Sequence, residues 1–425
     1  MMNRVAGIAL LFSIVVILGC RPEPVPDPDP DSIELTFEFR DSMPEKVLRS
    51  YLSRYIYMAE FCTHPSYQYD GMDSFKEDHE RMILNTGAKL ISGSVLIWGG
   101  ESRVVNDRTG FFDYITSTIA RVHEKDPEII FQGGIFEIVT PEVDQIAIPS
   151  WVFEAYGLPA EERNFKQTEM LNPDGSFANH WGNGGVPDIR QQEAQMWIYF
   201  LARQYIDAGI ESIHLGQAML MSMAEGPEAQ YESWTGVVEK IRAYAREDAR
   251  RGMVLLTAHV NKGMKKGDQL LFDYHGFPLR IVEKKGFPQE GILLIGEEPI
   301  YGNSLGGTTP GGWSCKSLPY IVEFDNYGIS DRPGEPNAGQ FWIWGYDEIS
   351  WFSQQPEDYR NEFLEYAIDW IEKRDPAGYL SMPGNRVITG PNGTRDRYMA
   401  NTPSDANGNK GYNQEVIIKT IWEQQ

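Results

Sequence analysis

Short apolar runs recur along the chain, and each ends in a carboxylate, imidazole, amide or indole side chain. Eight of them occupy residues 95–101, 128–137, 212–217, 253–259, 270–275, 292–298, 320–326 and 341–348. Continuous apolar runs bounded by Gly or Pro are typical of buried parallel strands. A set of eight predicts an α/β fold of the (β/α)₈ TIM-type barrel class, in which catalytic groups lie at the C-terminal ends of the strands.

Helical periodicity fills the gaps between these runs in the first half of the chain and returns near the end. Helices are predicted at residues 45–61, 74–88, 111–126, 191–209, 229–252 and 356–375. The first two precede the first strand as N-terminal helices. Between the fourth and the seventh run Gly and Pro prevail instead, so we expect a barrel that is distorted in its second half, with crossovers that lack full helices.

Two further segments depart from the alternation of strand and helix. Residues 138–187 form a long insertion with several prolines after the second strand, and a loop of this length is usually functional or separately folded. Because the insertion leaves the C-terminal end of a strand, it should lie over the active face. Residues 381–425 are expected to be a strap packed on the barrel, which could add one strand at 416–424. The barrel core then spans about 90–375 within a single domain, 33–425.

The N-terminal residues predict a targeting segment rather than part of the fold. Residues 1–20 carry Arg4 and then an apolar stretch, which is the pattern of a signal peptide. The stretch ends in the sequence ILGC, which resembles a bacterial lipobox; the resemblance implies that Cys20 is lipidated and anchors an exported chain to the cell envelope, at its periplasmic face or its outer surface. Ordinary secretion is the alternative. Residues 21–32 alternate Pro and Asp, which predicts a stiff tether.

Composition limits the partners of the chain. The 425 residues carry a formal net charge of -23 without a Lys/Arg cluster, so nucleic-acid binding is not expected. No cofactor is expected, and the oligomeric state is left open. Lipidation of Cys20 would leave two cysteines, Cys62 and Cys315, which could form a disulfide or remain separate thiols.

Strand parity selects which side chains can share one face, because side chains alternate along a strand. Glu323 and Asp325 share a face, as do Asp273 and His275. Glu297 and its neighbour Glu298 point in opposite directions, so only one of them can face a site, and the choice stays open. A carboxylate inside an apolar run is costly unless it is paired. A structural ion pair with Arg280 or with a histidine is therefore the alternative to a catalytic role.

Aromatic residues gather where the first and the eighth run end. Trp98 lies at the end of the first predicted strand, and Trp342, Trp344 and Tyr346 lie in the eighth run, whose strand would be its neighbour in a closed barrel. Flat aromatic faces beside carboxylates and amides suit pyranose rings. The alternative is that about half of these rings only fill the core.

Taken together, the lipobox, the tether, the parallel barrel and the aromatic, carboxylate-lined strand ends resemble exported bacterial glycoside hydrolases with a (β/α)₈ fold. In the large retaining clan of that fold, one Glu follows strand four and the nucleophile Glu ends strand seven. The resemblance places Glu323 at the strand-seven position. The fourth run ends in Thr257, Ala258 and His259 without an Asn-Glu pair, and this departure leaves the acid/base residue unassigned. An uncharacterised barrel family, related by fold alone, is the alternative.

These patterns predict a glycoside hydrolase that cleaves a poly- or oligosaccharide by carboxylate catalysis. Glu323 or Asp325 is the candidate nucleophile, and Glu297 or Glu137 is the candidate acid. The candidate substrate-binding residues are Trp98, Glu101, His214, Gln217, His259, Asp273, His275, Trp344 and Asp347.

Two other functions remain open on the sequence. A metal-dependent hydrolase or isomerase could use His214, His259, Asp273 and His275, although neither HxH nor HExxH spacing occurs. A surface lipoprotein that binds glycans without cleaving them would keep the aromatic residues and would need no matched pair of carboxylates.

Overall fold

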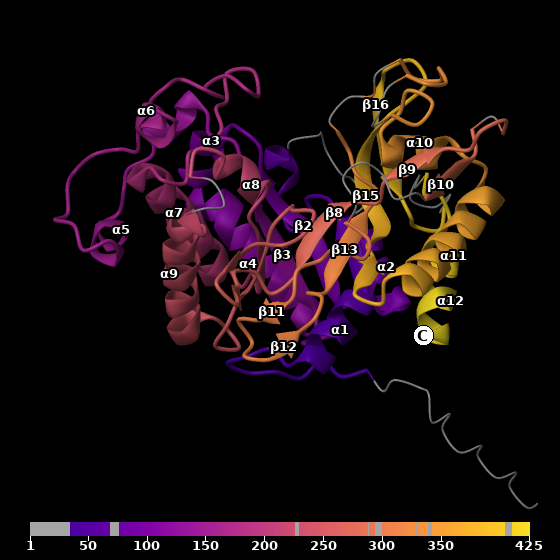
Figure 1. Cartoon of the computed structure of the whole chain (residues 1–425), viewed down its shortest axis with the longest axis horizontal. Helices are drawn as coiled ribbons and strands as arrows, with labels where there is room; N and C mark the ends of the chain where they lie inside the picture. The colour runs from indigo at the N-terminus through magenta and orange to yellow at the C-terminus, as the bar shows by residue number, and fades with distance from the viewer. Residues whose placement is uncertain are drawn as a thin grey trace, which may run out of the picture. The chain divides into compact units, whose positions relative to one another are not determined.

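The chain folds into a mixed α/β structure whose strands are mostly parallel, as a computed structural model shows (Figure 1). The structure describes residues 35–68, 76–225, 229–287, 289–293, 300–327, 330, 332–338, 342–403 and 410–425. Residues Leu35–Gln425 form one unit. The predicted signal peptide, Cys20 and the tether lie outside the described residues, as do Glu297 and Glu298.

Strands and helices alternate through the first half of the chain. The helical elements are α1 (Glu45–Ser53), η1 (Pro65–Tyr67), α2 (Lys76–Thr86), α3 (Glu101–Val105), α4 (Arg108–His123), η2 (Pro141–Gln145), α5 (Ser150–Ala155), α6 (Gln167–Met170), α7 (Gln192–Asp207), α8 (Ala218–Met221), α9 (Glu232–Asp248), α10 (Glu348–Gln354), α11 (Glu357–Arg374) and α12 (Glu415–Gln424). The strands are β1 (Tyr55–Met58), β2 (Leu90–Ile97), β3 (Ile130–Ile135), β4 (Ser212–His214), β5 (Leu255–Thr257), β6 (Lys265–Lys266), β7 (Gln269–Leu270), β8 (His275–Pro278), β9 (Ile281–Glu283), β10 (Gly291–Leu293), β11 (Gly307–Thr308), β12 (Ser314–Cys315), β13 (Tyr320–Glu323), β14 (Gly378–Leu380), β15 (Met382–Thr389) and β16 (Arg395–Met399).

Two parallel sheets carry the fold. The larger is seven-stranded with the order β16-β15-β1-β2-β3-β4-β5, and only β16 runs antiparallel to its neighbour. The smaller is three-stranded with the order β14-β13-β8, and all its strands are parallel. Among the described residues between β5 and β13, the short strands β6 to β12 stand where the first half of the chain has helices.

Both edges of the smaller sheet continue into the larger one through backbone hydrogen bonds. On one side a single residue, Ser381, separates β14 from β15, and its N–H donates to the carbonyl of Val322. On the other side His259, two residues after β5, forms a parallel bridge with Gly276 of β8. One hydrogen bond and one isolated bridge thus connect the smaller sheet to the larger one at these two places.

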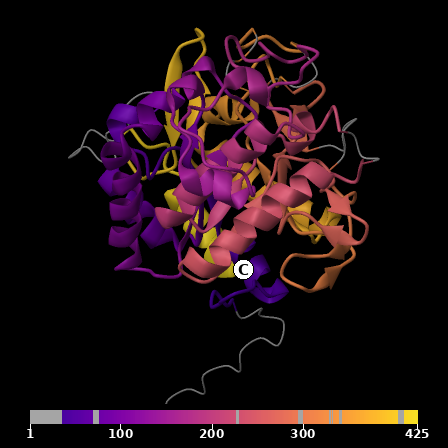
Figure 2. The same cartoon turned by 90° about the vertical axis from the view of Figure 1, so that its left-hand side faces the viewer.

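A compact cluster of side chains from several parallel strands lies where these strands begin. Its members from the sheets and their flanks are Tyr55, Leu90, Ile130, Leu255, Tyr274 and Ile321. Helix α1 covers this cluster with Val47, Leu48 and Tyr51. Outside the strands, α7 and α9 lie side by side (Figure 1), and Figure 2 shows helices in front of the strands when the unit is seen from that side. We call the residues of this compact cluster, with those of α1, the enclosed cluster. Because α1 covers the N-terminal ends of the strands, a site would have to lie at their C-terminal ends.

The predicted helix at 45–61 is wrong in its second half. Helix α1 ends at Ser53, and β1 follows directly as a parallel partner of both β2 and β15. The sequence YIYM of β1 continues the apolar spacing of the helix, but its aromatic and β-branched side chains fit a strand better, and pairing on both sides decides the outcome. The run at 95–101 therefore corresponds to the second strand in the chain, β2, and not to the first.

Three of the predicted strands need correction. Of the run at 270–275, only its last residue belongs to the parallel strand β8, and its first belongs to β7. The described part of the run at 292–298 belongs to β10, which pairs antiparallel with β9, and residues 294–299 are not described. The described part of the run at 341–348 carries an isolated bridge between Ile343 and Tyr346, and then α10 begins.

The C-terminal segment 381–425 is more than a strap. It contains β15, which pairs with β1 inside the larger sheet, and the antiparallel strand β16. The predicted extra strand at 416–424 is instead helix α12, which packs beside α2. The parallel strands β1, β14 and β15 thus lie outside the predicted core limits of about 90–375, one before them and two after them.

The insertion 138–187 folds onto α7 and contains η2, α5 and α6. Within it, Trp151 stacks on Phe200 of α7 with ring centroids 5.7 Å apart. No disulfide joins Cys62, which is buried, to Cys315, which is half-buried. Over the described ranges, no helix is long and apolar enough to cross a membrane.

Candidate functional site

In or just after eight parallel strands, β1, β2, β3, β4, β5, β8, β13 and β15, one side chain is half-buried while its neighbours are mostly buried. We call these residues, with the buried Asp325, the strand-end cluster: Tyr57, Trp98, Phe136, His214, His259, Phe277, Glu323, Asp325 and Arg386. Parity explains the selection, because Tyr57 lies two residues after Tyr55 and Glu323 two residues after Ile321, both of which lie in the enclosed cluster. The strand-end cluster therefore lies on the same inward side as that core, one layer closer to the C-terminal ends.

Aromatic and imidazole rings form one arc of the strand-end cluster. Trp98 lies 5.5 Å from Phe136, and Phe136 lies 6.0 Å from His214, measured between ring centroids. His214 lies 6.3 Å from His259, which lies 5.4 Å from Phe277. The arc follows the strand order β2, β3, β4, β5 and β8. Among the described residues neither His214 nor His259 has a side-chain hydrogen-bond partner, so both imidazoles are available to a ligand.

Arg386 of β15 organises the charged part of the strand-end cluster. Its Nη1 lies 3.1 Å from Glu323 Oε2, and its Nη2 lies 2.8 Å from Asp325 Oδ1. Nη1 also donates to the carbonyl of Phe324 at 2.8 Å. One guanidinium thus holds two carboxylates that the parity of β13 already places on one face, in the geometry that suits Arg best.

Burial and charge shift the titration of this group. Burial raises the pKa of Glu323 above its ordinary value, although the charge of Arg386 acts in the opposite direction. Burial, with the nearby His259 and Arg386, lowers the pKa of His214 to about 3, so His214 is neutral at physiological pH. A neutral imidazole can both donate and accept a hydrogen bond, as a sugar hydroxyl requires.

Tyr57 supports Arg386 from below, and a glycine makes this possible. The guanidinium carbon of Arg386 lies 4.2 Å from the centre of the Tyr57 ring. The ring rests on Gly93 of β2, where a Cβ atom would lie 2.6 Å from a ring carbon, and Gly93 has a φ of +63°. Both the space and the backbone conformation therefore favour Gly at this position.

Two acidic residues behind the strand-end cluster hold the backbone. Glu348 of α10 accepts hydrogen bonds from the backbone N–H groups of Leu279, Arg280, Ile281 and Asp325. Burial raises the pKa of Glu348 to about 7. The predicted substrate-binding residue Asp347 is fully buried as the N-cap of α10, where it accepts from Ser350 N, and burial raises its pKa to about 6.

Several other predicted site residues are engaged by the protein itself. Both carboxylate oxygens of Glu137 accept from Gln217, one from its backbone N–H and one from its side-chain amide. Glu101 accepts from the N–H and the hydroxyl of Thr140. These two carboxylates hold the loops after β2, β3 and β4 in place.

The pair Asp273 and His275 does not reach the strand-end cluster. Asp273 binds the guanidinium of Arg242 at 3.1 Å and accepts from Leu256 N. His275 is fully buried, with Nδ1 2.7 Å from the carbonyl oxygen of Val260 and Nε2 2.8 Å from Ser304 Oγ. Burial also lowers the pKa of His275 to about 4.

This arrangement bears on the metal hypothesis, which needed His214, His259, Asp273 and His275 to converge. Within the described ranges no group of three or more His, Cys, Asp or Glu side chains is arranged to hold a metal ion. The strand-end cluster brings together two carboxylates and two imidazoles, and such groups can in general serve as acid, base or nucleophile.

The structure does not bring Trp98 and Trp344 together at the ends of two neighbouring strands, as the sequence pattern predicted. Trp98 contacts Phe136 and also Trp181 of the insertion, at 5.4 Å. Trp344 lies in a tight turn with a φ of +52°, and its backbone N–H donates to Glu283. The described part of the run at 341–348 is not a strand, and the neighbours of β2 in the sheet are β1 and β3.

Sequence reasoning missed Tyr57, Phe136, Phe277 and Arg386. Phe136 lies in a run that was identified, and strand parity alone could have selected it. Gln132, Gly134 and Phe136 are two residues apart and therefore lie on the same face of the strand. Arg386 is the only charged residue of β15, but Pro383, Gly384 and Asn385 precede it and are typical of loops. Its role depends on the pairing of β15 with β1.

No family model matches the sequence, and no curated protein matches it either. Among solved structures, the debranching enzyme of Nostoc punctiforme soaked with acarbose is 10% identical, with 91% of this chain and 83% of that chain covered and a TM-score of 0.46. The maltogenic amylase of S. marinus is 11% identical, with 53% and 39% covered and a TM-score of 0.33. An α-amylase of Lactobacillus plantarum is 12% identical, with 53% of each chain covered and a TM-score of 0.32. The chain thus spans 39% and 53% of the two amylases, and at these TM-scores the likeness carries no argument about activity.

Proposed function

We propose that the chain is a glycoside hydrolase that acts on a poly- or oligosaccharide at the strand-end cluster. The observation that supports this proposal is that the strand-end cluster combines charged carboxylates with aromatic and imidazole rings. Glu323 and Asp325 share one arginine, and the arc from Trp98 to Phe277 supplies rings and free imidazoles. Sugars bind to a combination of flat apolar faces and directed polar groups, because each pyranose ring has both apolar C–H faces and hydroxyl groups.

In this proposal Glu323 is the nucleophile or base in its ionised form. It is the more accessible of the two carboxylates, with 19% of its side chain exposed against 11% for Asp325. Because burial raises its pKa, activity should fall as the pH becomes acidic and Glu323 takes up a proton. The two oxygens of Glu137 are engaged by Gln217, which leaves Glu297, outside the described residues, as the candidate proton donor.

The finer fold that we propose is a closed eight-stranded barrel. Its strands in order would be β1, β2, β3, β4, β5, β8, β13 and the continuous pair β14 and β15. The His259–Gly276 bridge and the hydrogen bond from Ser381 to Val322 support closure at the two junctions between sheets. The strand-end cluster then occupies the C-terminal face, where catalytic groups of barrel enzymes lie.

One observation favours a non-catalytic glycan-binding protein as the second candidate. Arg386 neutralises both carboxylates at once, and structural ion pairs perturb pKa values just as catalytic sites do. In that case Glu323 would only complete the charge balance of Arg386, and the aromatic arc would bind sugar without cleavage.

The two candidates differ in the outcome of one substitution. Glu323→Gln keeps the shape and removes the charge, so a hydrolase should lose reducing-sugar release by about 10²-fold or more. The matched control is Glu239→Gln, the same chemical change on the exposed face of α9. Both variants are compared by circular dichroism and then incubated with starch, hydroxyethyl cellulose, xylan and galactomannan. Equal release by Glu323→Gln and the wild type would refute the catalytic role, and no release by either would favour the binding protein.

The proposal also includes the cellular setting that the N-terminal pattern predicts. The chain would be exported and held at the cell envelope by lipidated Cys20, with the tether of residues 21–32 between anchor and folded unit. A glycan outside the cytoplasm would then reach the strand-end cluster without import.

A further inference from the structure

A cavity lies between the insertion and the segment that follows β4. Its volume is about 220 Å³, and its lining comes from residues 172–188 and 220–224. Pockets that enclose a whole small ligand usually measure about 300–1,000 Å³. The cavity is therefore suited to one unit of a longer molecule.

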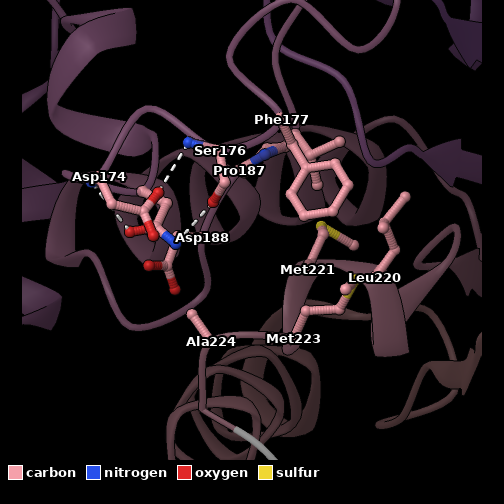
Figure 3. Close-up of a pocket in the computed structure, with 11 residues that line it drawn as sticks. Asp174, Ser176, Phe177, Pro187, Asp188, Leu220, Met221, Met223 and Ala224 are labelled. Atoms are coloured by element: carbon pink, nitrogen blue, oxygen red, sulfur yellow. Dashed lines mark hydrogen bonds between the residues drawn. The ribbon is translucent and has the colours of Figure 1, made fainter.

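The lining of the cavity is divided into an apolar and a polar side. Figure 3 shows Phe177, Leu220 and Met221 on one side and Asp174 and Asp188 on the other. Asp188 is held by Arg190, whose Nη2 lies 2.6 Å from Asp188 Oδ2, whereas Asp174 is exposed. Such a division offers an apolar face to the C–H groups of a sugar ring and, at the exposed Asp174, a carboxylate acceptor to its hydroxyls.

A continuous series of rings leads from this cavity to the strand-end cluster. Phe177 lies 5.3 Å from His180, His180 lies 4.4 Å from Trp181, and Trp181 lies 5.4 Å from Trp98. We call Phe177, His180 and Trp181 the insertion track. His180 is exposed, and Phe177 and Trp181 are half-buried, so the track is accessible along its length.

The loops that carry the cavity are tied to the site by hydrogen bonds. Gln217 directly precedes α8, which contributes Leu220 and Met221 to the cavity. Its backbone N–H and side-chain amide bind Glu137, the residue after Phe136. These hydrogen bonds connect the segment that lines the cavity to the end of β3. A ligand that contacts both the cavity and the strand-end cluster would therefore bind segments that are fixed relative to each other.

Charge narrows the class of ligand. The chain has a formal net charge of -23, and the lining of the cavity includes Asp174 and Asp188, of which Asp188 is paired with Arg190. An acidic polysaccharide would be repelled by this field, whereas a neutral one would not.

We propose that the cavity and the insertion track bind the continuation of a neutral polysaccharide chain whose scissile bond lies at the strand-end cluster. This inference rests on the proposed function for the position of the scissile bond only. It identifies the substrate as a neutral polymer rather than a mono- or disaccharide or an acidic glycan. It also gives the insertion after β3 its role, as the part of the chain that selects substrate length.

The test measures binding without cleavage, in the full chain that carries Glu323→Gln. Affinity electrophoresis is run in gels that contain starch, hydroxyethyl cellulose, xylan or galactomannan, with polygalacturonate as the acidic comparison. At least one neutral polymer should retard the protein, and Trp181→Ala should weaken that retardation about tenfold, as expected for a central aromatic anchor. Phe177→Ala is the second variant. The matched control is Trp370→Ala, which removes a half-buried indole from α11, remote in sequence from the insertion.

Each outcome decides between the alternatives. Retardation that depends on Trp181 and Phe177, but not on Trp370, supports the inference even if no polymer is cleaved, and absence of cleavage would then count against the hydrolase alone. Equal retardation of the Trp181→Ala and Phe177→Ala variants and their parent would overturn the inference. So would retardation by none of the neutral polymers, or stronger retardation by polygalacturonate.

Discussion

Arg386→Met should destabilise the fold strongly, and the loss should depend on pH. The substitution keeps much of the side-chain volume and removes the one cation that holds Glu323 and Asp325. Breaking a buried ion pair by removing one partner costs about 3–5 kcal/mol, and the lost stacking on Tyr57 adds about 1 kcal/mol. The side chain of Arg386 is only 12% exposed, so little of this is screened by solvent. We therefore expect a loss of about 4–6 kcal/mol at pH 8.

The pH dependence separates the charge from the packing contribution. Without Arg386 the pKa of Glu323 should rise further above its ordinary value, because burial already raises it and its counter-charge is gone. A group whose pKa is raised by folding contributes stability that is present at low pH and is lost as the pH rises through the raised pKa. The difference between wild type and Arg386→Met should therefore be larger at pH 8 than at pH 5, whereas the loss of stacking on Tyr57 is independent of pH.

Urea unfolding, followed by tryptophan fluorescence at both pH values, measures this difference. Arg386→Lys, which keeps a cation, should lose less, and Glu323→Gln combined with Arg386→Met should recover part of the loss. The matched control is Arg108→Met, because Arg108 is exposed and its guanidinium binds the amide oxygen of Gln204. A loss for Arg386→Met that is the same at pH 5 and pH 8, or below about 1 kcal/mol at both, would refute the reasoning from paired charges.

Three further predictions concern other parts of the chain. The pKa of Glu415 lies at about 2, because hydrogen bonds led by that from Arg81 outweigh the effect of burial. Glu415→Gln should therefore cost about 2–3 kcal/mol at pH 7, and calorimetry should show this cost shrinking as the pH falls from about 4.5 toward 2, since the wild type then loses its ionised carboxylate. Cys20→Ala should move the exported protein from the membrane to the soluble fraction, and unchanged partition on cell fractionation would exclude lipidation. Gly93→Ala should displace the Tyr57 ring and lower thermal stability by about 1–3 kcal/mol, and an unchanged melting temperature would contradict the close contact.

The apolar runs predicted part of the sheet correctly because burial on both faces leaves a local signal. The runs that contain β3, β4, β5 and β13 are continuous, rich in Ile, Leu and Val, and bounded by polar turns. Strand parity then placed Glu323 and Asp325 on one face, and the structure agrees, because both contact the same guanidinium. Local pattern and local geometry were sufficient for these features.

Other features depended on contacts that no local pattern contains. The run at 341–348 has the composition of a strand, but Asp347 caps α10 and the backbone turns instead. Strand β15 contains Pro383 and Gly384, which argue against a strand by composition. A Cβ atom at position 384 would lie 2.3 Å from the sulfur of Met58, so the glycine reflects the close approach of β1 and not a turn.

The same long-range pairing explains why carboxylates at strand ends are ambiguous in a sequence. Glu101, Glu137 and Glu348 all follow or flank strands, and each accepts hydrogen bonds from N–H groups of a neighbouring loop. Buried backbone N–H groups of a loop need acceptors, so a carboxylate at the end of a strand can have a structural role as well as a catalytic one. Glu323 differs because its partner is a side chain from the far end of the chain. Arg386 reaches it only when β14 pairs with β13 and β15 with β1, so the charged half of the strand-end cluster forms together with the last parallel strand. Formation of the site and completion of the sheet are then one event, and a change that weakens the pairing of β15 should separate the two carboxylates from their cation before it unfolds the first half of the sheet.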